Sequence, residues 1–226
     1  MPDLKKTAIT HTYIWQGNNE ELAQLKDAQD PVLVLFQGYK GLLTSNNTCY
    51  NLPVTNDLDL LKGTKELIEK FKEEKDEEKL AVTYNLCGMI SANFLKDYDA
   101  AMENYRAAFS FAQDALSGAS ILTNILVCAQ AAKQEDEAQE YFQVAKNMLE
   151  KISMDTSPDN RHLLATIYSS LAKRSYKQES GLCGKYYGIA QELWPESNVI
   201  SNNIAIALSK DYTKDAQGLL KAEGIL

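Results

Sequence analysis

The stretch Lys96–Phe109, KDYDAAMENYRAAF, carries the pattern that decides the fold. Small residues stand at Ala101 and Ala108, and an aromatic residue, Tyr105, stands between them. Because these intervals are four and three residues, all three side chains share one face of an α-helix. Small residues let a neighbouring helix approach closely, and the aromatic ring fills the space beside it. The stretch therefore predicts a helix packed tightly against its neighbours.

The same triad returns 37 residues later, and weaker versions of the pattern follow. The second copy consists of Ala138, Phe142 and Ala145. A third unit ends with Tyr187, Ala190, Leu193 and Pro195, and a fourth begins at Asn202 and has Ala216 and Leu220 in its second helix. Self-similarity at this period indicates stacked helical hairpins, since one hairpin cannot bury its own apolar face.

The order of small, aromatic and small residues resembles the second helix of a tetratricopeptide repeat. Tyr84–Gly88 resembles the first-helix signature of that repeat, displaced by one residue. We predict an all-α fold, a right-handed α-solenoid of tetratricopeptide-like antiparallel helix hairpins in a single domain over residues 1–226. Residues 1–79 are expected to form irregular helices, and residues 80–226 the clearest repeats. A generic helical bundle with accidental alanine spacing is the alternative.

The remaining segments fit a chain of helices separated by short breaks. We expect helices over 4–15, 19–28 and Pro31–Leu43, a loop over 44–56, and a further helix that begins at Asn56 or Asp57. The charged segment Glu69–Lys79 is interpreted as a solvated helix end and turn rather than an interaction patch. Later breaks are predicted near 96–98, 116–119, 133–136, 153–160, 177–181, 194–198 and 210–214.

Composition and charge exclude several classes of protein. Glycine and proline are scarce, 11 and 5 of 226 residues, which argues against turn-rich β folds. The formal net charge of −8 argues against nucleic acid or an anionic membrane as partner. We expect no signal peptide and no membrane-spanning helix. The cysteines, Cys49, Cys87, Cys128 and Cys183, are widely spaced and are expected to be reduced, mostly buried thiols of a cytoplasmic protein.

No catalytic or metal-binding motif stands out. The chain has two histidines, His11 and His162, too few for a zinc site or a histidine-based triad, and there is no glycine-rich phosphate loop. We expect a partly exposed structural role for His11 and a solvent-facing His162. The chain is therefore predicted not to be an enzyme, and no cofactor or metal is expected.

Asparagines within otherwise apolar helices are the candidate binding residues. Asn85, Asn124 and Asn203 occupy nearly the same repeat position, where an amide can both donate to and accept from a bound backbone. Met89 and Val127 lie about one turn further along the same helices. These five residues are predicted to line a concave partner-binding surface. Helix-terminus or inter-helix hydrogen bonds of the amides are an equally weighted alternative.

Beyond the repeat class, the order of segments resembles a divergent epsilon subunit of the coatomer (COPI) vesicle coat. The likeness rests on Tyr13–Asn18, on Tyr84–Ala108, and on Leu163–Ala172 followed by Tyr186-Tyr187 and Ala216–Leu220. It spans most of the chain, although each motif is weak alone. The insertion after Ala172 is longer than the family pattern, and the family usually continues with more helices.

The resemblance implies a non-enzymatic structural subunit whose repeats hold an extended hairpin from the C-terminal region of the coatomer alpha subunit. It also implies a cytoplasmic location, peripheral on Golgi or transport-vesicle membranes. A general tetratricopeptide adaptor or peptide sensor shares this mechanism with a different partner. A helical-domain enzyme without a recognisable motif is the third alternative.

Overall fold

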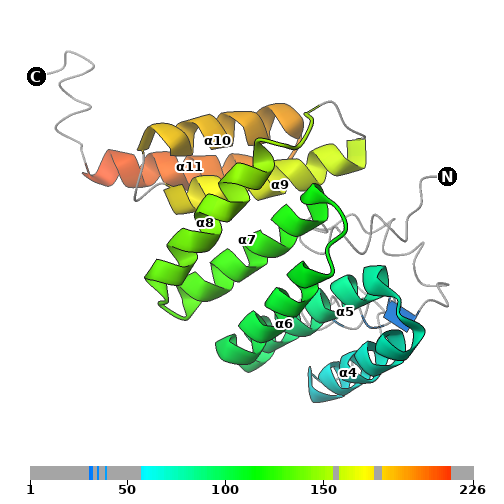
Figure 1. Ribbon diagram of the computed structural model, residues 1–226. Helices are drawn as coiled ribbons and strands as arrows, with labels where there is room; N and C mark the ends of the chain where they lie inside the picture. Colours follow the sequence, from blue (N-terminus) through cyan, green and yellow to red (C-terminus); the bar gives the residue numbers. More distant parts are fainter. Residues whose placement is uncertain are drawn as a thin grey trace, which may run out of the picture. The chain divides into compact units, whose positions relative to one another are not determined.

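The computed structural model describes residues 31–32, 35, 39, 57–154, 158–175 and 180–214. The described part is all-helical and contains no β-strand, which confirms the predicted all-α class (Figure 1). Backbone contacts divide the chain into two compact units, Met1–Ser153 and Met154–Leu226, here called unit 1 and unit 2. Each unit is described by itself. The single-domain, right-handed solenoid stays a prediction.

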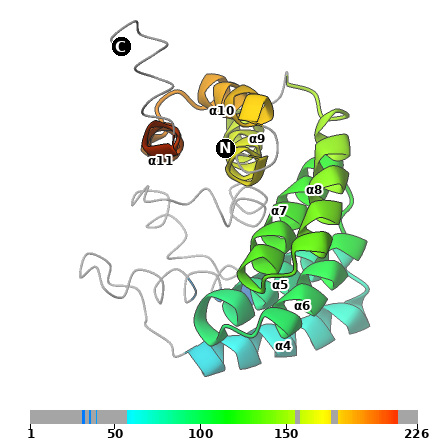
Figure 2. The ribbon, with the colours of Figure 1, turned by 90° about the vertical axis from the view of Figure 1, so that its left-hand side faces the viewer.

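Unit 1 contains α4 to α8, in which each helix packs against the next one in the chain. The helices are α4 (Asp57–Glu74), α5 (Glu77–Ile90), the π-helix η2 (Ser91–Leu95), α6 (Tyr98–Ser110), α7 (Ala115–Ala131) and α8 (Glu135–Leu149). Figure 2 shows these helices following one another from α4 to α8. The connections are short, so α5–α6 and α7–α8 form helical hairpins.

The two triads that predicted the hairpins lie in the interior of unit 1. Ala101, Tyr105 and Ala108 on α6 are buried, and so are Ala138, Phe142 and Ala145 on α8. A further cluster joins α4 to α5 through Ile68, Phe71, Leu80 and Cys87, together with Val32 of the chain before α4. The short-range sequence pattern therefore identified the faces that the helices bury.

The π-helix lengthens the first hairpin by one residue relative to the second. Asp114, the N-cap of α7, follows Asp76, the N-cap of α5, by 38 residues. Gln134, the N-cap of α8, follows Asp97, the N-cap of α6, by only 37. The first hairpin thus holds one extra residue between its two caps. Since a π-turn takes up one more residue than an α-turn, η2 accommodates the extra residue without a break.

A single glycine permits the tight packing of α5 on α6. A Cβ atom at Gly88 would stand 2.6 Å from two ring carbons of Tyr105, the aromatic residue of the first triad. This approach is closer than any side chain allows, so Gly88 admits the ring against the backbone of α5.

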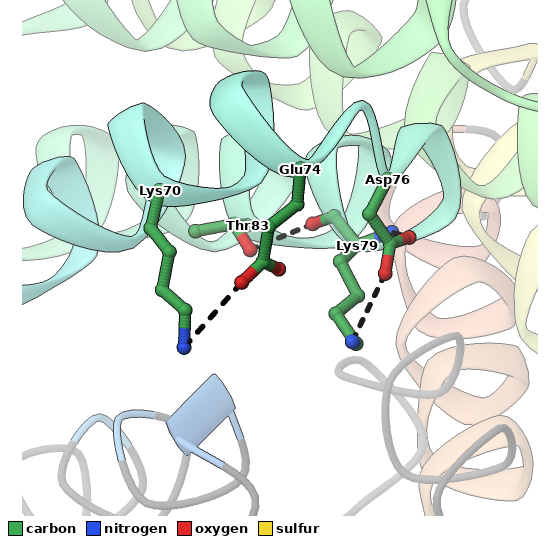
Figure 3. Close-up of polar contacts among 5 residues, drawn as sticks. All are labelled: Lys70, Glu74, Asp76, Lys79 and Thr83. Atoms are coloured by element: carbon green, nitrogen blue, oxygen red, sulfur yellow. Dashed lines mark hydrogen bonds and ion pairs between the residues drawn. The ribbon is translucent and has the colours of Figure 1, made fainter.

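The turn between α4 and α5 is held by charged side chains (Figure 3). Asp76 accepts a hydrogen bond from the backbone N–H of Lys79, and the Lys79 ammonium lies 2.9 Å from its second oxygen. Partial burial acts to raise the pKa of Asp76, but these contacts with Lys79 outweigh it and hold the pKa below its ordinary value. On the exposed side of α4, the Lys70 ammonium forms an ion pair with Oε1 of Glu74 at 3.8 Å. Glu69–Lys79 is therefore a helix end and turn, as predicted.

Unit 2 contains α9 (Pro158–Ser175), α10 (Ser180–Leu193) and α11 (Asn198–Lys214), which pack on one another. The expected third-unit residues Tyr187, Ala190 and Leu193 are buried on α10. The prediction that His162 faces solvent is wrong. Its ring is partly buried and stacks on Trp194, with ring centroids 4.4 Å apart, because the turn after α10 returns to the start of α9.

Two predicted helix breaks are also wrong. The break near 116–119 lies inside α7, which begins after the cap at Asp114, and Gly118 is a packing position beside Met148 and Phe109. The break near 210–214 lies inside α11. The expected helices 4–15 and 19–28, the loop 44–56, His11, Cys49, Ala216 and Leu220 lie outside the described residues. The remaining cysteines, Cys87, Cys128 and Cys183, are buried, and no disulfide joins them within the described part of the chain.

Candidate functional site

Three of the five predicted surface residues lie in the interior of unit 1. Asn85 is 6%, Met89 2% and Asn124 2% exposed. Nδ2 of Asn124 donates a hydrogen bond of 2.8 Å to Oδ1 of Asn85, and Nδ2 of Asn85 lies 3.9 Å from the Met89 sulfur. The spacing predicted that these residues line an exposed surface, whereas the structure buries them, because the two amides face each other between α5 and α7. This is the inter-helix hydrogen bond that the sequence left as an alternative.

The other two predicted residues have different surroundings. Val127 lies on α7 and is 42% exposed. Asn203 lies on α11 of unit 2, where its Nδ2 donates to Oγ of Ser169 on α9 at 3.3 Å. A role for any of the five in binding a partner stays a prediction.

The amide pair stands between two hollows on one face of α5 and α7, here called the α5–α7 face. On α7, the lining residues recur at intervals of three or four from Ser117 to Ala131, whereas on α5 and η2 the lining stops at Asn85 and resumes at Ala92. Asn85 lines the hollow near the beginnings of both helices, and Asn124 lines the hollow near their ends. The two hollows are therefore joined by one stripe of lining residues on α7 and are separated on the α5 side.

The first hollow is small and carries acidic groups. It encloses about 80 Å³ and is lined by Glu78, Asn85, Asp114, Ser117 and Ser120, with Phe111, the C-cap of α6. Asp114 is the N-cap of α7, and it accepts hydrogen bonds from the Ser117 backbone N–H at 2.9 Å and from the Ser117 hydroxyl at 2.6 Å. Both oxygens of the Asp114 carboxylate are therefore engaged in capping the N-terminus of α7.

The second hollow is larger and is bordered by a cation. It encloses about 220 Å³ and is lined by Asn93, Lys96, Tyr98, Tyr105, Asn124 and Val127, with Ala92, Cys128 and Ala131. Lys96 ends η2 in the left-handed region, at a φ of 57°, and its ammonium donates to the Asn93 carbonyl at 2.7 Å. The two hollows therefore differ in the sign of their charged groups.

One polar atom of a residue that lines the second hollow has no partner within the described part of the chain. Oδ1 of Asn124 is buried and accepts no hydrogen bond from the described residues. A buried acceptor left unsatisfied costs about 1–3 kcal/mol. The amide directs its NH₂ group toward Asn85, and Asn124 is among the residues that line the second hollow.

The thiols near this face are not poised for nucleophilic chemistry. Burial raises the pKa of Cys87 and of Cys128 to about 11. Both are therefore protonated at neutral pH, when the nucleophilic form of a cysteine is the thiolate. Over the described residues, no group of three or more histidine, cysteine or acidic side chains is placed to hold a metal ion. None of the described helices is both long and apolar enough to cross a membrane.

The spacing of the asparagines did not point to Lys96 or to the hollow beside it. A signal was present in the sequence, because the interval between the asparagines differs from the other repeat intervals. Asn124 follows Asn85 by 39 residues, whereas the caps of α5 and α7 are 38 residues apart and the buried triads 37. The two amides are thus not equivalent positions, and the extra residue lies in η2, at the edge of the second hollow.

No protein-family model, curated protein or solved structure matches the chain in the comparisons made.

Proposed function

We propose that this protein is a non-enzymatic scaffold whose α5–α7 face holds an extended segment or hairpin of a partner protein. The observation that carries the proposal is the arrangement of the face, in which two hollows flank a hydrogen-bonded amide pair along a stripe of α7. An extended chain needs alternating pockets for its side chains and polar groups for its backbone. A stripe with two hollows of opposite charge supplies both.

The packing of the helices in unit 1 favours a rigid framework beneath such a face. The triads of α6 and α8 are buried, so the second helix of each hairpin is used for packing. Most residues of α5 and α7 are buried as well, and Glu78 of α5 and Val127 of α7 are among those that remain exposed. In a stack of hairpins, binding surfaces formed by one helix of each pair are typical of repeat proteins.

The specific form of the proposal is a coatomer epsilon-like subunit with tetratricopeptide-like repeats. Its partner would be the C-terminal region of the coatomer alpha subunit, and its place would be the cytoplasmic side of Golgi or transport-vesicle membranes. This form rests on the resemblance in segment order alone. A general adaptor uses the same face for a different segment, so one experiment can examine both.

The test compares two valine-to-arginine variants in affinity purification from cells of the source. Val127→Arg changes the α5–α7 face, and Val144→Arg changes a comparably exposed position on α8, outside the lining of both hollows. Val127 is a cleaner probe than Asn124, because substitution of Asn124 also removes the hydrogen bond to Asn85.

We expect the alpha coat subunit to be recovered with the unmodified chain and with Val144→Arg, and to be lost with Val127→Arg at an unchanged melting temperature. Recovery of other proteins with the same dependence on Val127 would favour the general adaptor. Equal recovery with both variants would exclude the α5–α7 face as the binding surface.

A further inference from the structure

The first hollow has room for an unbranched side chain. Its volume is about 80 Å³. A protein cavity of about 150 Å³ binds benzene, and one of about 10–15 Å³ holds a water molecule. The first hollow therefore offers several times the space that a water molecule needs, and about half of the space in which an aromatic ring is held. A flexible chain of a few atoms fits it best.

The walls of the first hollow suit the methylene groups of such a chain. They include Ala81 and Val82 of α5 and Ile121 of α7, with Phe111 beside them. Apolar side chains of this kind gain from contact with other carbon atoms that would otherwise face water. Long cationic side chains commonly bury their stems along apolar surface in this way and keep the charged end near polar groups.

The charges of the first hollow have one sign. Glu78 and Asp114 line it, and no lysine or arginine is found among the described residues of its lining. Glu78 is exposed and forms no ion pair with any described residue. Asp114 is engaged in capping but keeps its negative charge, and the whole chain carries a formal net charge of −8. A cation is therefore the favoured occupant.

A buried hydroxyl provides a second and independent observation. Ser120 lines the first hollow and is 6% exposed, and its hydroxyl makes no hydrogen bond with the described residues. Unlike Oδ1 of Asn124, this oxygen is not wholly covered by the described part of the chain. A serine hydroxyl accepts hydrogen bonds as well as donating one, so it can receive a donor that enters the hollow.

We infer that the first hollow receives a lysine side chain of the partner segment. Its methylene groups contact the apolar walls, and its ammonium group is attracted by Glu78 and Asp114 and donates to Oγ of Ser120. The planar guanidinium of arginine is bulkier and fits the small volume less well. The inference rests on the proposed function, because it names one side chain of the segment that the α5–α7 face holds.

The test uses the whole chain and two small probes, n-butylammonium chloride and 1-butanol, in an NMR titration of the backbone amides at low ionic strength. Both probes carry the same four-carbon chain and a hydrogen-bond donor, and only the first is charged. We expect both to shift the signals of Ala81, Ser120 and Ile121. The ammonium should bind about fivefold more tightly, because a solvent-accessible ion pair contributes up to about 1 kcal/mol.

Three variants locate the contacts. Glu78→Gln should reduce the fivefold preference to less than about twofold, since only the capping carboxylate of Asp114 remains. Glu77→Gln is the matched control, because Glu77 is exposed in the same first turn of α5 and does not line the hollow. It should keep the preference. Ser120→Ala should weaken both probes by similar factors, since each of them donates to the hydroxyl.

Three results would overturn the inference. The first is equal binding of the two probes by the unmodified chain, or no shift of the signals around the hollow. The second is a preference that Glu78→Gln and Glu77→Gln retain equally, which would show a general attraction of cations to an acidic chain. The third is unchanged binding of both probes by Ser120→Ala.

Failure of this inference can be distinguished from failure of the proposed scaffold function, because the titration involves no partner protein. In the affinity purification, Glu78→Lys should lower recovery of the partner, and Glu77→Lys should not. A partner that is lost with Val127→Arg and fully recovered with Glu78→Lys would leave the scaffold function in place and exclude the lysine in the first hollow.

Discussion

The hairpins α5–α6 and α7–α8 of unit 1 are built on one plan and differ in how each contact is made. Each first helix begins at an aspartate cap, Asp76 or Asp114, and each second helix buries a triad of two alanines and an aromatic residue. The first hairpin contains the additional residue in η2, and the second has an unbroken α-helix in its place.

The difference shows that packing tolerates an insertion when it is absorbed within a helical turn. The caps and the buried triads keep their roles in both hairpins, so the cores remain equivalent. The extra residue instead changes the surface at the end of α5, where the second hollow lies. One side of the second hollow is thus formed by the hairpin that departs from the regular pattern, and the other side by α7.

The largest expected difference between the hairpins concerns their glycines. Gly88→Ala places a Cβ 2.6 Å from the buried ring of Tyr105, and such overpacking costs about 1–3 kcal/mol of unfolding free energy. Gly118→Ala meets the end of the flexible Met148 side chain at 2.8 Å. The gain in helix propensity, up to about 1 kcal/mol, offsets the movement of Met148. Denaturant unfolding measures both variants, and equal losses would show that the hairpins do not differ in this way.

A reciprocal exchange of caps tests the starts of the second helices. Asp97 accepts a hydrogen bond from the Ala100 N–H, whereas Gln134 makes no side-chain cap bond at a similar backbone conformation. Asp97→Gln should lower the unfolding free energy by about 1 kcal/mol. Gln134→Asp should raise it by a smaller amount, about 0.5 kcal/mol, because Glu135, Asp136 and Glu137 follow in the first turn. Thermal unfolding checks both, and a destabilised Gln134→Asp would contradict the comparison.

The smallest expected effect distinguishes the caps of the first helices. Asp76 is paired with the Lys79 ammonium, and the corresponding partner of Asp114 is the hydroxyl of Ser117. Asp76→Asn keeps a good cap and removes the ion pair, so it should cost about 0.2–1 kcal/mol near neutral pH and less in high salt.

The pH dependence of that loss has a definite sign. The pKa of Asp76 is lowered in the folded chain, so its ion pair contributes fully above the ordinary aspartate value near 4. The contribution disappears as the pH falls through the lowered value. The difference between Asp76→Asn and the unmodified chain, measured by unfolding from about pH 6 to about pH 2, should therefore vanish on acidification. A difference that persists at low pH would assign the effect to the cap alone.

Local patterns predicted much of the fold and little of the candidate site. The alanine and aromatic positions of α6 and α8 follow from helical periodicity, which a single segment displays completely. Gly118 was interpreted as a break because glycine commonly ends helices, yet it lies within α7 beside Met148. That interpretation failed because close approach of another helix, which also favours glycine, is not visible in one segment.

The sequence by itself determined the helical class, the turns with their aspartate caps and the faces that hairpins bury, since these depend on residues within one or two turns of each other. Only the tertiary structure decided that Asn85 and Asn124 pair with each other, and that Asn124 leaves one buried acceptor without a partner among the described residues. Those outcomes depend on the distance between α5 and α7, which is set by the packing of α6 beside both. No local pattern specifies that distance, so the site became visible only in the folded chain.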